Sequence, residues 1–564
     1  MKKILFLLLI ITGFTSCNDF LDTLPDNRTQ IDNLEKVKAL LVSAYPNRYY
    51  GASLESRCDG VVDHGITAIG QMSPSFQFNH TGFKWDEHSN VATADDTDSY
   101  WSAAYSAIAS ANHAIEAIDR LGRTKESLPY LGEALLCRAY VHFTLMTLFT
   151  NFFDEDNRDI NPGIPYVTEI EEETNKQYSR GTVNSTFDAV KRDLEEGMKY
   201  VGTASAYTYP KFHFTKDAAI MLALRIAQFD RDYENVIFYA NQLIPAPTRF
   251  AHLFDSNTMD TVRNVDGTVQ SLPHPQDLAY QFAGANLFDW YKTSKQATSY
   301  QGVAQAFSNP DNPNVILCSE PYSMLERTTV SNFYIRYTFS YDNFVEIAGA
   351  NVTGYDWALP TYSMGSGGTA NSPSYLPKIY EDFKSNSINA GTGQPYIKIA
   401  LFRLEEAILA RAEAYAMLKE YNKSLHDMTM YVQRRVQTEE LARFTFTRDK
   451  VVDYYTRKIK STDHFLSSKF NASRFSTDIN EYEGLLQRGL VLAVLDARRM
   501  EFLYEGMRWF DILRWNIPVK HTLSSGESST LTPDDDRRVI QLPETTSLSG
   551  LKKNRYDNIP FPWK

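Results

Sequence analysis

The feature that most constrains the fold of this chain is a series of segments whose apolar residues recur three or four positions apart. The first such segment begins near Tyr100 and carries Trp101, Ala104, Tyr105, Ile108, Ala111, Ile115 and Ile118. This spacing places the side chains on one face of a helix, and the helix must bury that face against a partner. A second helical segment, residues 130–149, follows Gly122. We therefore predict an antiparallel helix pair.

Later stretches predict more helices of the same kind. Residues 185–201 predict one helix, and residues 218–244 predict two helices around a turn at 230–233. Further on, a turn at 419–422 leads into a helix at 423–436, and the helix before this turn is marked by Leu401, Leu404, Ile408, Ala412 and Tyr415. When Tyr233 is aligned with Tyr421, Ala219 falls on Ala407 and Ile220 on Ile408.

These helix–turn–helix units resemble tetratricopeptide repeats of about 34 residues, whose helix pairs stack because neither can bury its apolar face alone. No unit shows the full repeat pattern, so an irregular helical bundle is the alternative. The predicted fold class is mostly α, with a scaffold of tetratricopeptide-like helix pairs.

Between about residues 245 and 395 the character of the sequence changes. Glycine, proline, asparagine and serine become frequent, and aromatic clusters stand in turn-rich sequence, as at 287–291, 354–357 and beside the glycine-rich 364–369. Long loops in a compact protein are functional or disordered, and the aromatic content argues against disorder. We predict a long irregular, loop-rich region that carries the ligand site.

The first residues predict a bacterial lipoprotein signal. Met1-Lys2-Lys3 is followed by an apolar run over residues 4–13 and then by Cys17. The run is too short to span a bilayer, so residues 1–16 are expected to be removed and Cys17 to become a lipidated N-terminus. An ordinary secretory signal with an incidental cysteine is the alternative.

Charge and ligand-type residues exclude several classes of site. The net charge of −12 argues against a nucleic-acid surface, which needs a concentrated basic patch, and it also disfavours an acidic ligand. The other cysteines, Cys58, Cys137 and Cys318, show no CxxC spacing and predict neither a disulfide framework nor a zinc site. The acidic runs 95–98 and 534–536 lack the glycine and distal glutamate of an EF-hand. We predict no cofactor and leave open only an incidental calcium ion.

Near the C-terminus, residues 498–515 read RRMEFLYEGMRWFDILRW. This run resembles the RRxEF-x-EG-x-RWFDL-x-RW signature of the SusD/RagB family, with Ile512 in place of the usual leucine. Four further segments resemble the same family in the same order, at residues 17–22, 101–119, 163–165 and 403–414.

The resemblance implies a mostly α-helical lipoprotein of the outer membrane that faces the cell exterior. It also implies a partner, a SusC-like TonB-dependent β-barrel that the lipoprotein covers as a lid. Members of the family typically bind oligosaccharides or polysaccharides, and some resemble peptide binders. We divide the chain into a signal peptide, 1–16, an N-terminal helical region, 17–245, a loop-rich region, 246–395, and a C-terminal helical region, 396–564.

The charged residues of the signature are candidates for a catalytic site. On one helix, Glu501 and Glu505 would share a face, as the acid and base of glycoside hydrolysis could. They alternate with arginines, among them Arg498, Arg508 and Arg514, which would keep both carboxylates ionised, whereas a general acid needs a raised pKa. We predict a structural ion-pair network and no catalytic residue.

The aromatic residues of the loops are the candidate ligand contacts, because a flat ring can cover the apolar face of a sugar while nearby polar groups bind its hydroxyls. The candidates are Trp85, Trp290, Tyr291, Tyr355 and Trp357. Core packing is the alternative for each of them. Helical spacing assigns Trp101, Trp509 and Trp515 to the core.

The predicted function is non-catalytic capture of a glycan at the cell surface and its delivery to the SusC-like barrel. A peptide ligand, a surface glycosidase and a purely structural repeat scaffold are the alternatives. A glycosidase would need two carboxylates in a cleft that are not paired with arginine.

Overall fold

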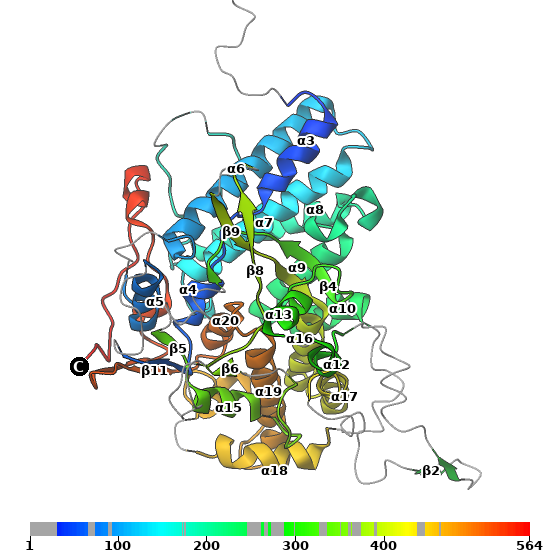
Figure 1. The fold of residues 1–564 in the computed structure, drawn as a ribbon, viewed down its shortest axis with the longest axis vertical. Coiled ribbons are helices and arrows are strands. Elements are labelled where there is room, and N and C mark those ends of the chain that lie inside the picture. The colour runs from blue at the N-terminus through cyan, green and yellow to red at the C-terminus, as the bar shows by residue number, and fades with distance from the viewer. Residues whose placement is uncertain are drawn as a thin grey trace, which may run out of the picture.

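A computed structural model of the chain describes residues 31–564 except 66–73, 88–92, 172, 174–175, 245–260, 264–268, 272–286, 298, 326–335, 350, 359–361, 364–373, 388–391, 437–445 and 462–463. The described chain is mostly helical, with short antiparallel strand pairs (Figure 1), which confirms the predicted fold class. The predicted signal peptide, Cys17 and the glycine-rich segment 364–369 lie outside the described residues.

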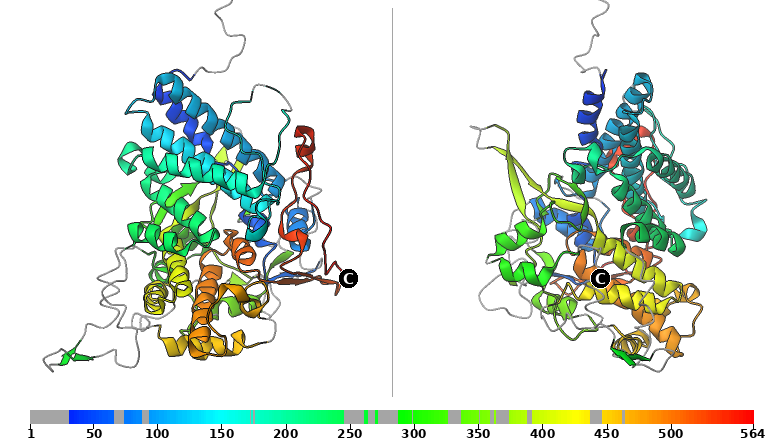
Figure 2. Two further views of the ribbon diagram at one scale, coloured as in Figure 1. Left: turned by 180° about the vertical axis from the view of Figure 1, so that it is seen from behind. Right: turned by 90° about the vertical axis from the view of Figure 1, so that its right-hand side faces the viewer.

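Helices of the N-terminal region gather at one end of the molecule (Figure 1, Figure 2). They are α3 (Leu34–Leu41), α6 (Thr97–Leu121), α7 (Leu128–Phe149) and α8 (Val183–Tyr200). The side chain of Asp96 caps α6 by accepting a hydrogen bond from Ser99, and Gly122, with φ +93°, ends it. Helix α7 is buried almost all round because α6 and α8 both pack against it, so the predicted helix pair is confirmed.

Two helix pairs repeat one another in detail. They are α9 (Lys216–Phe229) with α10 (Tyr233–Leu243), and α16 (Leu404–Met417) with α17 (Tyr421–Val432). In each turn the residue two positions before the aligned tyrosine is left-handed, Arg231 with φ 59° and Lys419 with φ 64°. Because α10 packs on α16, the two pairs stack, and the alignment of Tyr233 with Tyr421 is confirmed at the level of the backbone.

Two predicted helix boundaries are wrong. Leu401 lies in strand β10 (Ile399–Arg403), which pairs antiparallel with β4 (Val315–Ser319), and α16 begins only at Leu404. A few apolar residues at helical spacing do not exclude a strand before the helix starts. Helix α17 ends at Val432, and Val436 instead forms a bridge with Trp357.

The signature 498–515 is not one helix. Helix α19 (Tyr482–Glu501) ends inside it, and α20 (Met507–Arg514) begins after a turn in which Tyr504 and Gly506 have φ of 67° and 71°. A Cβ on Gly506 would stand 3.0 Å from the Cα of Gly51. Glycine is therefore required twice here, by the left-handed backbone and by the close approach of α4 (Gly51–Glu55).

The remaining elements surround this scaffold. The helices are α5 (Pro74–Lys84), α12 (Trp290–Gln296), α13 (Tyr300–Phe307), α15 (Tyr341–Gly349) and α18 (Arg448–Ile459). The strand pairs are β1 (Val61–Asp63) with β5 (Tyr337–Phe339), β2 (Thr261–Arg263) with β3 (Val269–Ser271), β6 (Tyr362–Ser363) with β7 (Ser374–Tyr375), β8 (Glu381–Ser385) with β9 (Gly393–Ile397), and β11 (Val519–Thr522) with β12 (Ser528–Leu531). The central region is thus less irregular than its composition indicates, since α12, α13 and α15 all lie within it.

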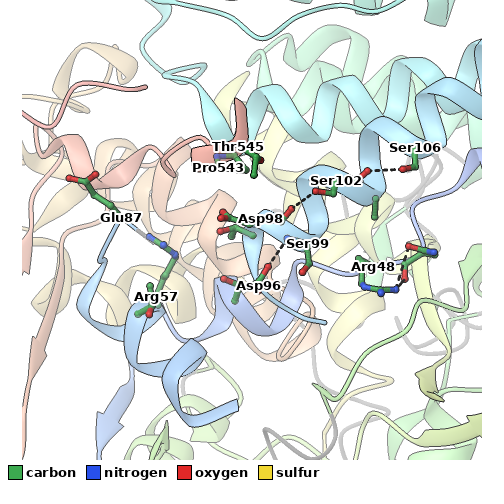
Figure 3. Close-up of a pocket in the computed structure, with 16 residues that line it drawn as sticks. Arg48, Arg57, Glu87, Asp96, Asp98, Ser99, Ser102, Ser106, Pro543 and Thr545 are labelled. Carbon is green, nitrogen blue, oxygen red and sulfur yellow. Dashed lines mark hydrogen bonds between the residues drawn. The ribbon is translucent and has the colours of Figure 1, made fainter. Parts of the chain in front are cut away.

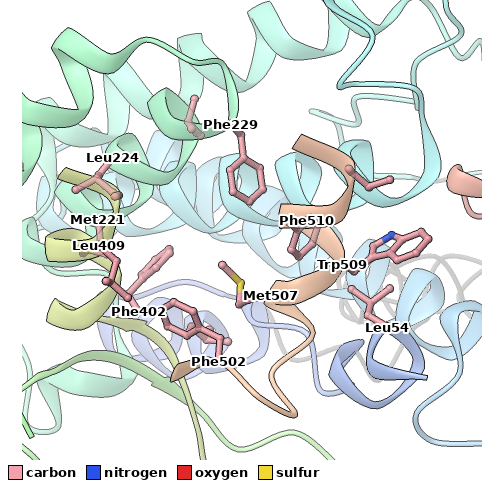
Figure 4. Close-up of a cluster of buried hydrophobic side chains, with 14 of the residues drawn as sticks. Leu54, Met221, Leu224, Phe229, Phe402, Leu409, Phe502, Met507, Trp509 and Phe510 are labelled. Atoms are coloured by element: carbon pink, nitrogen blue, oxygen red, sulfur yellow. The ribbon is translucent and has the colours of Figure 1, made fainter. Parts of the chain in front are cut away.

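The core joins segments from the whole length of the chain. Figure 4 shows side chains that meet between α4, α9, β10, α16 and the signature, among them Leu54, Met221, Phe229, Phe402, Leu409, Phe502, Trp509 and Phe510. Trp101, Trp509 and Trp515 are all buried, as predicted. Within the described ranges no helix is long and apolar enough to cross a bilayer.

Candidate functional site

The loop tryptophan Trp85 is buried. It follows α5 with φ 55°, and its side chain is 1% exposed. The indole nitrogen donates to the carbonyl of Arg57 at 3.1 Å, and the ring stacks on His521 with 4.5 Å between ring centroids. The ring is thus packed within the protein. It offers no surface to a ligand in this structure.

Trp290 and Trp357 are buried as well, each 1% exposed. Their rings meet edge to face at 6.5 Å, and the guanidinium of Arg435 lies 4.7 Å from the centroid of Trp290. The core alternative therefore describes all three tryptophans. Tyr355 is different, because it is 47% exposed. The side chain of Tyr291 lies outside the described part of the structure.

The charged residues of the signature lie in a buried ion-pair network, as predicted, but the arginines that pair with Glu501 and Glu505 come from outside the signature. Arg403 reaches Glu501 at 3.1 Å and Glu505 at 2.9 Å, and Arg435 reaches Glu501 at 2.7 Å. Further along, Asp511 accepts from Arg498 and from Arg514, both at 2.9 Å. All of these side chains are buried, so the network lies in the core and not in a cleft.

The network fixes the charge of its central carboxylate. Burial alone raises the pKa of Glu501, but the positive charges of Arg435, Arg403 and Lys378 outweigh burial and lower the pKa to about 2. A carboxylate held ionised in this way has no proton to donate near neutral pH. Glu501 is therefore unsuited to the role of general acid.

A pocket of about 460 Å³ opens between segments that are far apart in the sequence (Figure 3). Its walls come from residues beside α4, from the end of α5, from the first half of α6 and from the start of η11 (Glu544–Ser549). Among its described lining residues none is aromatic and most are polar. Such a pocket suits a ligand rich in hydrogen-bonding groups.

One wall of the pocket is a row of serines on α6. Ser99, Ser102 and Ser106 line it at helical spacing, as Figure 3 shows. Their hydroxyls donate to the carbonyls of Thr93 at 2.7 Å, Asp98 at 3.1 Å and Ser102 at 3.0 Å. Because each proton is engaged with the backbone, the hydroxyl oxygens are left as acceptors for a ligand.

Two carboxylates stand at the N-terminal end of the same helix. Asp96 accepts from the backbone amides of Thr93 at 2.6 Å and Ser99 at 2.5 Å, so its oxygens serve the helix. Burial, reinforced by the negative charges of Asp96 and Glu544, raises the pKa of Asp98 to about 6. Asp98 is thus a carboxylate that titrates in mildly acidic solution.

Two arginines and a third carboxylate, Glu87, also line the pocket. Arg48 lies 4.5 Å from the ring centroid of Tyr322 and donates to the carbonyl of Asn47 at 3.0 Å. Arg57 is 3% exposed, and its Nε has no hydrogen-bond partner. Burial lowers the pKa of Arg57, and the neighbouring Tyr556 and Asp86 offset this effect only in part. Arg57 faces the pocket from the side opposite Asp98 (Figure 3).

A second cavity, of about 980 Å³, lies between the ends of α7 and α8 and the C-terminal segment. Its central arginine, Arg180, already donates to the carbonyls of Gly163 at 2.7 Å and Lys552 at 3.0 Å and to the side chain of Asn554 at 2.8 Å. Its role there is to hold the C-terminal segment in place. We therefore take the pocket beside α6 as the candidate site.

The described residues contain no group of three side chains that could hold a metal ion. In the acidic runs, Asp96 caps α6 and Asp535 caps a short 3₁₀ turn.

Comparison with known proteins connects this architecture to one family. A family model described as starch-binding and associating with the outer membrane matches residues 19–227, and a second, described as the SusD family, matches residues 326–554. No curated protein sequence matches the chain.

Solved structures show the same fold at low sequence identity. A SusD superfamily protein from Bacteroides vulgatus is 17% identical, with a TM-score of 0.53 over 92% of this chain and 97% of that one. A SusD superfamily protein from Bacteroides thetaiotaomicron is 14% identical, with a TM-score of 0.53 over 92% and 99%. A SusD-like carbohydrate binding protein from Bacteroides vulgatus is 15% identical, with a TM-score of 0.52 over 91% and 96%. With the signature, the family models and the fold in agreement, the chain belongs to the SusD/RagB family.

Proposed function

We propose that this chain captures a glycan without chemical conversion and delivers it to a SusC-like TonB-dependent transporter. The observation that carries the proposal is the polar pocket beside α6 in a protein of the SusD/RagB family. The fold is shared with a protein described as carbohydrate binding, which supports the same class of ligand.

The lining matches the chemistry of a sugar. A pyranose ring presents hydroxyls that both donate and accept, so its site needs both kinds of partner. The oxygens of Ser102 and Ser106 accept, and Arg48 and Arg57 carry N–H donors. Tyr355 remains the predicted aromatic contact, on a surface apart from this lining.

The proposal includes a place on the cell. Lipidation at Cys17 would anchor the chain to the outer membrane, and the family resemblance orients it toward the cell exterior, over the barrel. The family model described as associating with the outer membrane supports this location.

Capture without catalysis is supported by the carboxylates of the signature. Glu501 and Glu505 are both paired with Arg403 in the core, which is the opposite of what the glycosidase alternative requires. A hydrolytic turnover that disappeared in Glu501→Gln would overturn this part of the proposal.

Affinity electrophoresis through gels that contain single polysaccharides tests the site. We expect one glycan to retard the protein without residues 1–17, and Ser106→Trp to abolish the retardation by filling the pocket. Ser110→Trp is the matched control, since Ser110 donates to the carbonyl of Ser106 at 3.1 Å on the same helix but does not line the pocket. Retention of peptides with no response to any glycan would favour the peptide-binding alternative.

A further inference from the structure

Arg57 is an exception among the buried arginines of the described chain. Most of the others face a carboxylate, as Arg138 faces Asp193 at 2.6 Å and Arg411 faces Asp427 at 2.8 Å. Arg538 has no carboxylate in contact but donates to the carbonyl of Ile517 at 3.1 Å. Arg57 alone has a guanidinium that forms no hydrogen bond with any described residue.

Such an arrangement is costly for a folded protein. A charge removed from water needs an opposite charge or several hydrogen bonds to offset its desolvation. The ring centroid of Trp509 lies 5.9 Å from the guanidinium carbon of Arg57, and the negative charge of Asp86 acts on Arg57 without contacting it. That contact leaves the N–H donors of the guanidinium without acceptors. The missing acceptors can come from whatever enters the pocket that Arg57 lines.

We propose that the glycan bound in this pocket carries an anionic substituent, a carboxylate or a sulfate, that pairs with Arg57. This inference rests on the proposed function and narrows its substrate class to acidic glycans. A planar guanidinium donates two parallel hydrogen bonds to such a group, which gives orientation as well as affinity.

Three carboxylates line the pocket, Glu87, Asp96 and Asp98. The oxygens of Asp96 are held by two backbone amides at the N-terminus of α6, where the helix dipole offsets the negative charge. Asp98 stands on the α6 wall, and Glu87, which also lines the pocket, stands beside Arg57 in Figure 3, although no ion pair joins these two described side chains. Arg48 adds a second positive charge to the lining. The pocket thus combines the guanidinium of Arg57, which has no hydrogen-bond acceptor among the described residues, with hydroxyl oxygens of α6 that accept hydroxyl protons.

The test uses polysaccharides in matched pairs. Polygalacturonate is compared with its carboxyl-reduced form, and sulfated chondroitin with its desulfated form, so that the two anion types are distinguished. We expect the purified protein to bind one charged member at least about 10-fold more tightly than its matched form, because losing a charge-assisted hydrogen bond costs about that factor. Arg57→Gln should remove the preference, and Lys552→Gln, outside this pocket, should keep it.

Folding of the variants is checked by circular dichroism. If Arg57→Gln does not fold, Arg57→Lys takes its place, because it keeps the charge but loses the paired donors and should weaken charged-glycan binding about 10-fold. Competition by free galacturonate but not galactose against the unaltered protein provides a readout without any variant.

The outcomes separate the two proposals. Binding of a glycan that Ser106→Trp abolishes, with no preference for charge, would overturn the acidic substrate and keep glycan capture. Binding of no glycan of either kind would overturn both.

Discussion

Two charged regions of this protein differ in whether their buried arginines are paired with carboxylates. In the signature, every carboxylate of the Glu501, Glu505 and Asp511 set is matched to arginine, in a core that solvent does not enter. In the pocket beside α6, Arg57 is equally buried but unmatched. Burial alone therefore does not distinguish a structural charged residue from a ligand-binding one in this protein. The two kinds of residue differ in whether the protein supplies a carboxylate or another acceptor for the buried arginine.

The strongest test of the paired region is Glu501→Ala. This change leaves Arg403 and Arg435 buried without their shared carboxylate and also removes the acceptor of the Tyr431 hydroxyl. We expect the free energy of unfolding in urea to fall by about 3–5 kcal/mol. Glu35→Ala, which removes an exposed ion pair with Lys38, should change it by less than about 0.5 kcal/mol. A loss below about 1 kcal/mol for Glu501→Ala would remove the contrast between the regions.

Gly506→Ala tests the point where the two regions touch. The substituted Cβ would meet α4, beside the pocket, and the backbone there is left-handed. We expect a loss of about 2–3 kcal/mol in the free energy of unfolding. Gly526→Ala is the matched control, since its φ is +96° and a Cβ would meet nothing within 4 Å. It should cost about 1 kcal/mol from backbone strain alone. Equal losses for both variants would exclude the steric contact with α4.

Asp98, in the lining of the pocket, should make the free energy of unfolding depend on pH. The folded-state pKa of Asp98 is raised to about 6 from 3.8. Asp98 therefore favours unfolding once it ionises, and its unfavourable effect grows as pH rises between these values. The negative charges of Asp96 and Glu544 add to the rise in the pKa of Asp98, and the positive charge of Lys553 opposes it. We expect Asp98→Asn to raise the free energy of unfolding by about 1 kcal/mol at pH 7, after allowance for solvent screening, and to have no effect at pH 4.

The control for that titration is Asp188→Asn on α8, where the carboxylate is exposed beside Lys191. It should change stability by less than about 0.5 kcal/mol at either pH. A gain for Asp98→Asn that was the same at pH 4 and pH 7 would show that ionisation is not its cause.

The smallest effect is expected from the unmatched cation. Arg57→Met removes a buried charge that no described residue pairs, so the free energy of unfolding should change by less than about 1 kcal/mol or rise. Arg498→Met breaks the buried pair with Asp511 and should lower it by about 3 kcal/mol. Similar losses in the two variants, measured by urea unfolding, would show that Arg57 has a structural partner after all.

Sequence periodicity predicted the helical scaffold because a helix is a local structure. The apolar pattern along α6 is set by residues within a few turns of one another. The turn shared by Tyr233 and Tyr421 can be recognised by aligning the two sequence segments. The break inside the signature was missed because left-handed residues such as Tyr504 leave no trace in apolar spacing. The strand that contains Leu401 was missed for a related reason, since its partner lies far away in β4.

The candidate site was the least predictable part. Large aromatic residues in turn-rich sequence suit a ligand platform and a core equally, and the fold places Trp85, Trp290 and Trp357 in the core. The pocket brings Arg57 and Thr545 together from opposite ends of the chain. No property of Arg57 in the sequence shows that it lacks a partner, because its isolation exists only once every neighbour is in place.

The matching turns at Arg231 and Lys419 have a consequence for the history of the chain. Helices α10 and α16 are neighbours in the stack, although the whole central region separates them in sequence. That region is in effect an insertion between adjacent repeats, with its two ends fixed close together by the scaffold. Loop length adds little to the entropy of closing such an insertion, so its contents can be exchanged at small cost to folding. Selection could therefore rebuild the loops for a new nutrient while the helices beneath them stayed the same.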